Sequence, residues 1–171
     1  MRYSVFSSKK SDYPNHSFVR IRDTDTGQTW ITRAGPSSKD LGGFIVHKVT
    51  GTLTVKAETT SESKSYDTAV IKDKNKEVGV VATTTLPGVT GADVANQATD
   101  YSNAMNKDNA LYDENVNSNS YAFGAYDKLT GTNLPADPSM PGSGNRIPDA
   151  TKPTPDTPPK GCQIMVGGTC Q

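Results

Sequence analysis

From residue 2 to residue 84 the chain is a succession of short segments in which apolar and polar residues alternate. Alternation with a period of two puts every second side chain on one face of a strand, which is typical of a half-buried β-sheet. Hairpin-type turns such as Asp25-Thr26-Gly27 separate the segments. The predicted strands are residues 2–7, 16–22, 29–33, 44–49, 52–60, 66–72 and 78–84. Short turns between successive strands predict an antiparallel sheet.

Two segments with helical periodicity follow the predicted strands. The first covers residues 91–106, and the second covers residues 118–129 and stops at Gly131. Apolar residues recur at helical spacing in the first segment, at Val94, Ala98, Tyr101 and Met105. The predicted fold class is therefore α+β, an antiparallel sheet with two helices packed at one side.

The composition changes abruptly near residue 133, because eight of the eleven prolines lie between Pro135 and Pro159. Prolines at this density interrupt helices and strands, and they predict an extended tail. We therefore expect an α+β domain over residues 1–132 and a Pro/Gly-rich tail over residues 133–171. The two cysteines, Cys162 and Cys170, both lie in this tail. A disulfide in an oxidising compartment and two free thiols remain equal alternatives there.

Composition limits the classes of function. The chain has 171 residues, and its 18 Lys and Arg balance its 18 Asp and Glu. Zero net charge argues against nucleic acid as the main partner. No segment approaches the roughly 18 apolar residues that a transmembrane helix needs. The apolar stretch among the first residues is too short and too polar for a secretory signal. Export is therefore expected to depend on another domain or apparatus.

The segment Asn117-Ser118-Asn119-Ser120-Tyr121 stands at the start of the second predicted helix. Asn and Ser accept hydrogen bonds from the free N–H groups of a first helical turn, so the segment is expected to cap that helix. A nucleophile at the same place gains from the helix dipole, which favours negative charge. His16 opens a predicted strand upstream. A strand histidine that faces a hydroxyl at a helix start is a workable base and nucleophile pair.

These two segments resemble the circularly permuted papain-like hydrolases, a group with the PPPDE peptidases, the lecithin:retinol acyltransferase relatives and permuted cell-wall amidases. That group begins with a strand that carries the catalytic histidine. In these proteins the nucleophile lies later in the sequence, in an Asn-Cys-Asn-Thr-Phe or similar motif at the start of a helix. His16 matches the family histidine, and Ser118 stands where the family usually has cysteine. The resemblance covers roughly residues 1–130 in order and spacing.

The resemblance implies a site. His16 is expected to act as general base on Ser118, and Asn117 or Asn119 to orient the site or to donate to the oxyanion. Thr32 on the neighbouring strand is the candidate third residue that holds the imidazole. His47 is the rival base, because the chain has two histidines. A hydroxyl needs a better-aligned base than a thiol, so an active Ser–His site, a retired site that only binds and a purely structural motif all stay open.

The implied activity is hydrolysis of an amide bond in a peptide or in peptidoglycan through an acyl-enzyme. No cofactor and no metal are expected, because the two cysteines lack histidine partners for zinc. By analogy with similar domains, we expect a secreted bacterial toxin or effector, delivered to another cell or its periplasm and matched by an immunity or inhibitor protein. Two alternatives remain: a lipid acyl-hydrolase or acyltransferase on the same scaffold, and a non-catalytic binding module of a phage or secretion system.

Overall fold

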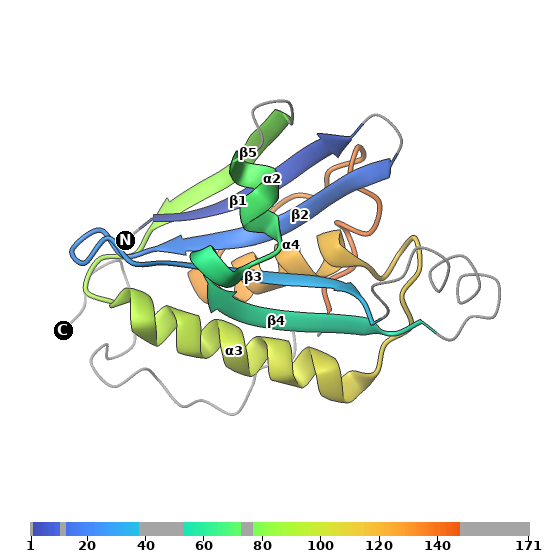
Figure 1. Ribbon diagram of the computed structural model, residues 1–171. Coiled ribbons are helices and arrows are strands. Elements are labelled where there is room, and N and C mark those ends of the chain that lie inside the picture. The colour runs from blue at the N-terminus through green and yellow to red at the C-terminus, as the bar shows by residue number, and fades with distance from the viewer. Residues whose placement is uncertain (1, 11–12, 38–52, 73–76, 148–171) are drawn as a thin grey trace.

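The structure, a computed structural model, describes residues 2–10, 13–37, 53–72 and 77–147. These residues form an α+β fold in which helices pack on an antiparallel sheet (Figure 1). The predicted α+β class, with an antiparallel sheet and two long helices, is confirmed. The predicted strand 44–49, His47 and both cysteines lie outside the described residues.

Within the described residues the sheet has five strands in the order β4-β3-β2-β1-β5, and every neighbouring pair is antiparallel. The strands are β1 (Arg2–Lys10), β2 (Tyr13–Arg22), β3 (Thr29–Pro36), β4 (Val55–Ser61) and β5 (Glu77–Thr85). The alternation that predicted them is visible in β4, where Val55 and Ala57 are buried while Lys56 and Glu58 are exposed.

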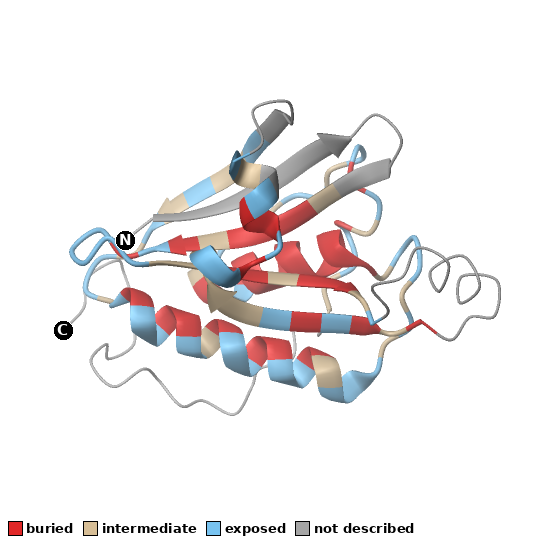
Figure 2. Ribbon diagram, viewed as in Figure 1, coloured by how far each residue is buried: buried red, intermediate tan, exposed pale blue. Residues whose placement is uncertain are grey.

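The long helices α3 (Gly91–Asp108) and α4 (Ser118–Thr130) pack on one face of the sheet. Figure 2 shows the buried residues of α3 on the side that is turned toward the sheet. Val19 and Ile21 of β2 share the core of this face with Tyr121 and Tyr126 of α4. This face therefore holds the main hydrophobic core of the described residues.

The second face of the sheet is covered by two short helices, the 3₁₀ helix η1 (Glu62–Lys64) and α2 (Asp67–Lys72). Successive side chains of a strand point to opposite faces, so the even residues of β2 lie on this side. Arg20 accordingly pairs with Glu62 of η1, with 2.8 Å between Nε and Oε2.

The helix α2 stands where a strand over residues 66–72 was predicted, so that prediction is wrong. A short apolar run does not distinguish strand from helix, and tertiary contacts decide between them. Here the Ser65 hydroxyl accepts a hydrogen bond from the Asp67 N–H at 3.3 Å, and the Asp67 carboxylate is drawn to Arg33 on the sheet. These contacts fix the first turn of α2.

Strands β2 and β3 separate along their length. They pair only between Val19↔Thr32 and Arg22↔Thr29, whereas β3 remains paired with β4 as far as Pro36↔Val55. Figure 1 shows the two strands diverging toward the end at which β2 begins. The first half of β2, which contains His16, therefore has β1 but not β3 as a paired neighbour.

Residues 134–147 pack against α4, so the predicted start of the tail at residue 133 is wrong for this segment. Met140 is 5% exposed and belongs to the core. The Nε of Arg146 lies 2.6 Å from Oδ2 of Asp127 on α4, and the Tyr101 hydroxyl donates to the carbonyl of Ile147 at 2.7 Å. Proline density misled the prediction, because side chains of the helices bind the backbone groups of this segment.

Replacing Met140 by alanine tests whether this segment is part of the domain. We expect Met140→Ala to lower the free energy of unfolding by about 2 to 5 kcal/mol, because a core side chain is lost. Pro135→Ala, at an exposed position of the same segment, should change it by less than about 0.5 kcal/mol. Urea unfolding followed by circular dichroism measures both. If both substitutions left the free energy of unfolding unchanged, residues 134–147 would be a free tail.

Candidate functional site

His16 lies on β2 and faces α2. Its Nε2 atom is 3.3 Å from Oδ1 and 3.5 Å from Oδ2 of Asp67, the first residue of α2. The imidazole is partly open, with 26% of the side chain exposed. A carboxylate beside one ring nitrogen fixes the orientation of a histidine. Because Nε2 makes this contact, Nδ1 is the ring nitrogen of His16 that remains for another partner.

Asp67 is buried between two basic side chains. Its side chain is 1% exposed, and the Nε of Arg33 lies 2.8 Å from Oδ2. Burial alone would raise the pKa of Asp67, but the hydrogen bond and charge of His16, together with Arg33, outweigh burial and lower that pKa. Asp67 is therefore held as a carboxylate at neutral pH.

Arg33 has two further contacts. Its NH1 atom lies 3.2 Å from Oε1 of Glu58 on β4, and its guanidinium carbon lies 5.5 Å from the ring centre of Tyr66. A guanidinium over an aromatic face gains from the ring quadrupole. These contacts hold Arg33 at the face of the sheet that α2 covers, where it neutralises Asp67.

Ser118 is the first residue of α4 and is 4% exposed. Its hydroxyl and its backbone N–H are both hydrogen-bonded to the phenol oxygen of Tyr112. Tyr112 is placed by the start of β4, since its N–H donates to the carbonyl of Leu53 at 2.6 Å. Burial raises the pKa of Tyr112, while the bonds from Ser118 and the charge of Arg33 oppose that rise. Tyr112 is thus a neutral phenol.

One cluster of polar groups therefore reaches from α2 to the start of α4, which we call the His16–Ser118 cluster. Its members are His16, Asp67, Arg33, Tyr112 and Ser118. The charge of Arg33 acts on Asp67 and on Tyr112, although the two belong to opposite layers of the fold. The cluster lies at the end of the sheet where β2 and β3 are unpaired, although β3 remains paired with β4 there. His16 faces α2 and Ser118 begins α4, so the two residues lie on opposite faces of the sheet. Within it, His16 contacts Asp67 and Ser118 contacts Tyr112, and no hydrogen bond joins His16 to Ser118.

The two asparagines beside Ser118 hold the local backbone. Oδ1 of Asn117 accepts a hydrogen bond from the Asn119 N–H at 2.8 Å, and its Nδ2 donates to the carbonyl of Glu114 at 2.8 Å. The Asn117 N–H also donates to the Ser120 hydroxyl, which completes a capping box. Nδ2 of Asn119 donates to the carbonyl of Pro141 at 2.9 Å. The Asn117 amide is thus occupied by the cap, whereas Asn119 uses its Nδ2 and leaves its buried Oδ1 without a hydrogen-bond partner among the described residues.

Thr32 does not hold the imidazole of His16. It lies on the face of the sheet that α3 and α4 cover, and its hydroxyl is 2.5 Å from the Tyr121 hydroxyl and 2.9 Å from that of Thr59. Asp67 occupies the position beside His16 instead. Asp67 has no signal in the sequence, because residues 66–72 are predicted to form a strand, in which an aspartate beside a tyrosine indicates no site.

Comparisons with protein-family models, with curated proteins and with solved structures found no match to this chain. Among the described residues, no three His, Cys, Asp or Glu side chains gather as ligands for a metal ion. Likewise, no helix in the described part of the chain has the length and apolar character to cross a membrane.

Substitution of Asp67 tests the electrostatic account of the cluster. A group whose pKa is lower in the folded protein than its ordinary value of 3.8 stabilises the fold above that value. The contribution is lost as the pH falls through the lower, folded pKa. Asp67→Asn should therefore reduce the free energy of unfolding at neutral pH, on the order of 3 kcal/mol, because it removes the carboxylate that pairs with Arg33.

The difference between wild type and Asp67→Asn should begin to shrink below about pH 4, where Asp67 of the unfolded chain takes up a proton, and should go on shrinking until the pH lies below the lower pKa of the folded protein. Asp100→Asn, at an exposed aspartate of α3, is the matched control and should behave as wild type. Urea unfolding at a series of pH values measures all three proteins. A difference that stays constant down to pH values of about 2 would contradict the account.

Proposed function

We propose that the chain is a serine hydrolase of amide bonds in peptides or peptidoglycan, with the His16–Ser118 cluster as its reacting centre. Ser118 is the nucleophile, His16 is the general base and Asp67 is the residue that orients the imidazole. The observation that carries the proposal is the contact of 3.3 Å between His16 and the buried carboxylate of Asp67. The papain-like resemblance of the two segments supports the same roles, and secretion, delivery to another cell and an immunity protein are proposed by that analogy alone.

The proposed reaction follows from the chemistry of these groups. His16 takes the proton of the Ser118 hydroxyl as its oxygen attacks the amide carbonyl, and N–H groups at the start of α4 stabilise the oxyanion. The carbon–nitrogen bond breaks, the amine leaves with the proton from His16, and an acyl ester remains on Ser118. Water, deprotonated by His16, then hydrolyses that ester to a carboxylic acid and regenerates the serine.

Tyr112 has to leave Ser118 before this reaction. Its phenol oxygen accepts from the Ser118 N–H, at the helix start where an oxyanion would be bound. Substrate binding is proposed to displace the phenol and free the Ser118 hydroxyl. Because His16 faces the opposite side of the sheet, the start of α4 and the first half of β2 must also shift to bring the two side chains together. Tyr112 is thus a positioning residue that keeps Ser118 inactive in the absence of substrate.

A non-catalytic binding module is the second candidate. The observation that favours it is the burial of Ser118 at 4% exposure, together with the bonds by which its neighbours cap α4. On this view the asparagine and serine residues are structural, and the pair of His16 with Asp67 fastens α2 to the sheet.

A fluorophosphonate probe separates the two candidates, because it reacts with an activated serine whether the natural substrate is an amide or an ester. We expect the probe to add one phosphonyl group to Ser118, found by mass spectrometry. Ser118→Ala should abolish labelling, and His16→Ala should slow it by about 100-fold or more. Ser37→Ala, at an exposed serine, is the control and should label as wild type. Melting temperatures of all variants establish that they are folded.

Tyr112→Phe sharpens this test. Removing the phenol oxygen frees the Ser118 hydroxyl without removing the ring, so we expect labelling to accelerate severalfold relative to wild type. Absence of labelling in folded wild type and in folded Tyr112→Phe would reject the hydrolase and leave the binding module. A panel of peptidoglycan, protein and lipid-ester substrates then identifies the bond that a labelled protein cleaves.

A further inference from the structure

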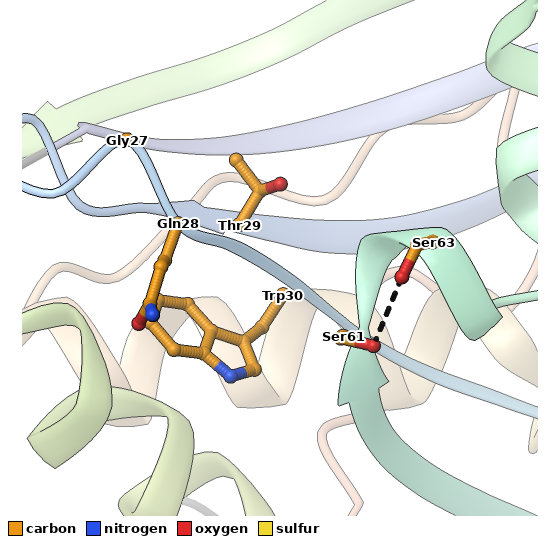
Figure 3. A pocket seen from close by; sticks show the side chains of 6 residues that line it. All are labelled: Gly27, Gln28, Thr29, Trp30, Ser61 and Ser63. Carbon is orange, nitrogen blue, oxygen red and sulfur yellow. Dashed lines mark hydrogen bonds between the residues drawn. The ribbon is translucent and has the colours of Figure 1, made fainter.

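A pocket opens at the other end of β3, where that strand begins. It has a volume of about 340 Å³ (Figure 3). The lining residues come from the turn between β2 and β3, from the start of β3 and from the end of β4 with η1: Gly27, Gln28, Thr29, Trp30, Ser61 and Ser63. None of them belongs to the His16–Ser118 cluster.

Trp30 is the aromatic wall of this pocket. Its indole ring is half-buried and packs so closely on the first residue of α3 that a Cβ built on Gly91 would lie 2.7 Å from Cζ3. The N–H of Gly91 also donates to Oδ2 of Asp23 at 2.7 Å, which ties the β2–β3 turn to α3 beside the ring. The ring is therefore a rigid surface rather than a mobile side chain.

The polar side chains that line the pocket are neutral. Figure 3 shows the side chain of Gln28 alongside the indole, and the hydroxyls of Ser61 and Ser63 are 3.3 Å apart. Among the described residues, neither the Gln28 amide group nor the Trp30 indole N–H has a hydrogen-bond partner. The lining contains no charged side chain. The pocket thus combines an aromatic face with uncharged hydrogen-bond donors and acceptors.

This chemistry selects one class of ligand. An anion or a cation would find no counter-charge among the lining residues, and a lipid chain would leave the amide and hydroxyl groups unpaired. A sugar ring has C–H bonds on its faces, which pack on the electron-rich face of an indole, and hydroxyls at its rim. Amide and hydroxyl side chains are suited to bind that rim, since each both donates and accepts.

We propose that this pocket binds a neutral saccharide unit, with one face of the sugar ring on Trp30 and its hydroxyls on Gln28. The proposal does not rest on the hydrolase, because the pocket and the His16–Ser118 cluster share no residue. Whether the chain is a hydrolase or a binding module, the pocket would give it a contact to a glycan-bearing surface.

Intrinsic fluorescence tests the proposal directly, because Trp30 is the single tryptophan of the chain. The full chain is titrated with chitotriose, cellotriose and maltotriose. With at least one of them we expect a saturable change in the emission of Trp30. Gln28→Ala should weaken that binding by about fivefold, the effect of one lost hydrogen bond. Asn103→Ala, at an exposed amide on α3, is the matched control and should bind as wild type.

Trp30→Ala is followed by isothermal calorimetry, since it removes the fluorophore. It should lose measurable binding while Ser118→Ala retains it, which separates this site from the hydrolase. Absence of a saturable response to all three saccharides up to about 10 mM, where even a millimolar site would be filled, would overturn the proposal. Unchanged affinity in folded Gln28→Ala or Trp30→Ala would overturn it as well.

Discussion

The buried carboxylate of Asp67 is the constraint on which the candidate site depends. Its side chain is 1% exposed and lies between His16 and Arg33, so its charge is compensated only while α2 stays against the sheet. A buried charge that loses its partners is far costlier than one that keeps them. The same contact therefore fastens α2, orients the imidazole of His16 and places Arg33 where its charge also acts on Tyr112.

The start of α4 depends on a second set of bonds. Asn117 and Ser120 form a capping box, and Asn119 reaches across to the carbonyl of Pro141. Ser120 donates to the carbonyl of Gly142 at 2.8 Å, so the helix start and residues 134–147 stabilise each other. Most polar groups at the start of α4 are thus used by the cap and by residues 134–147, and Ser118 is bonded to Tyr112 instead.

Sequence patterns predicted the elements whose signals are local. The helix α3 begins at the Thr90 cap, whose hydroxyl accepts from the Asp93 N–H at 3.2 Å, and α4 ends at Gly131 with a φ of 68°. The helix α2 was missed because its cause is a contact with Arg33 on another element. For the same reason Asp67 and Tyr112 were absent from the predicted site, and Thr32 was wrongly expected to hold the imidazole. Residues that contact each other across the fold but lie far apart in the sequence produce no periodic pattern from which the contact could be predicted.

We propose that His16 and Ser118 act together across the sheet, at the end where β2 and β3 are unpaired. A crystal structure of the chain with a phosphonyl group on Ser118 tests it most directly. We expect a phosphonyl oxygen bound by N–H groups at the start of α4 and the Tyr112 phenol displaced. The His16 imidazole, still held by Asp67, should lie within hydrogen-bond reach of the adduct. An adduct that forms while His16 remains on the far side of the sheet, without contact to it, would contradict the account.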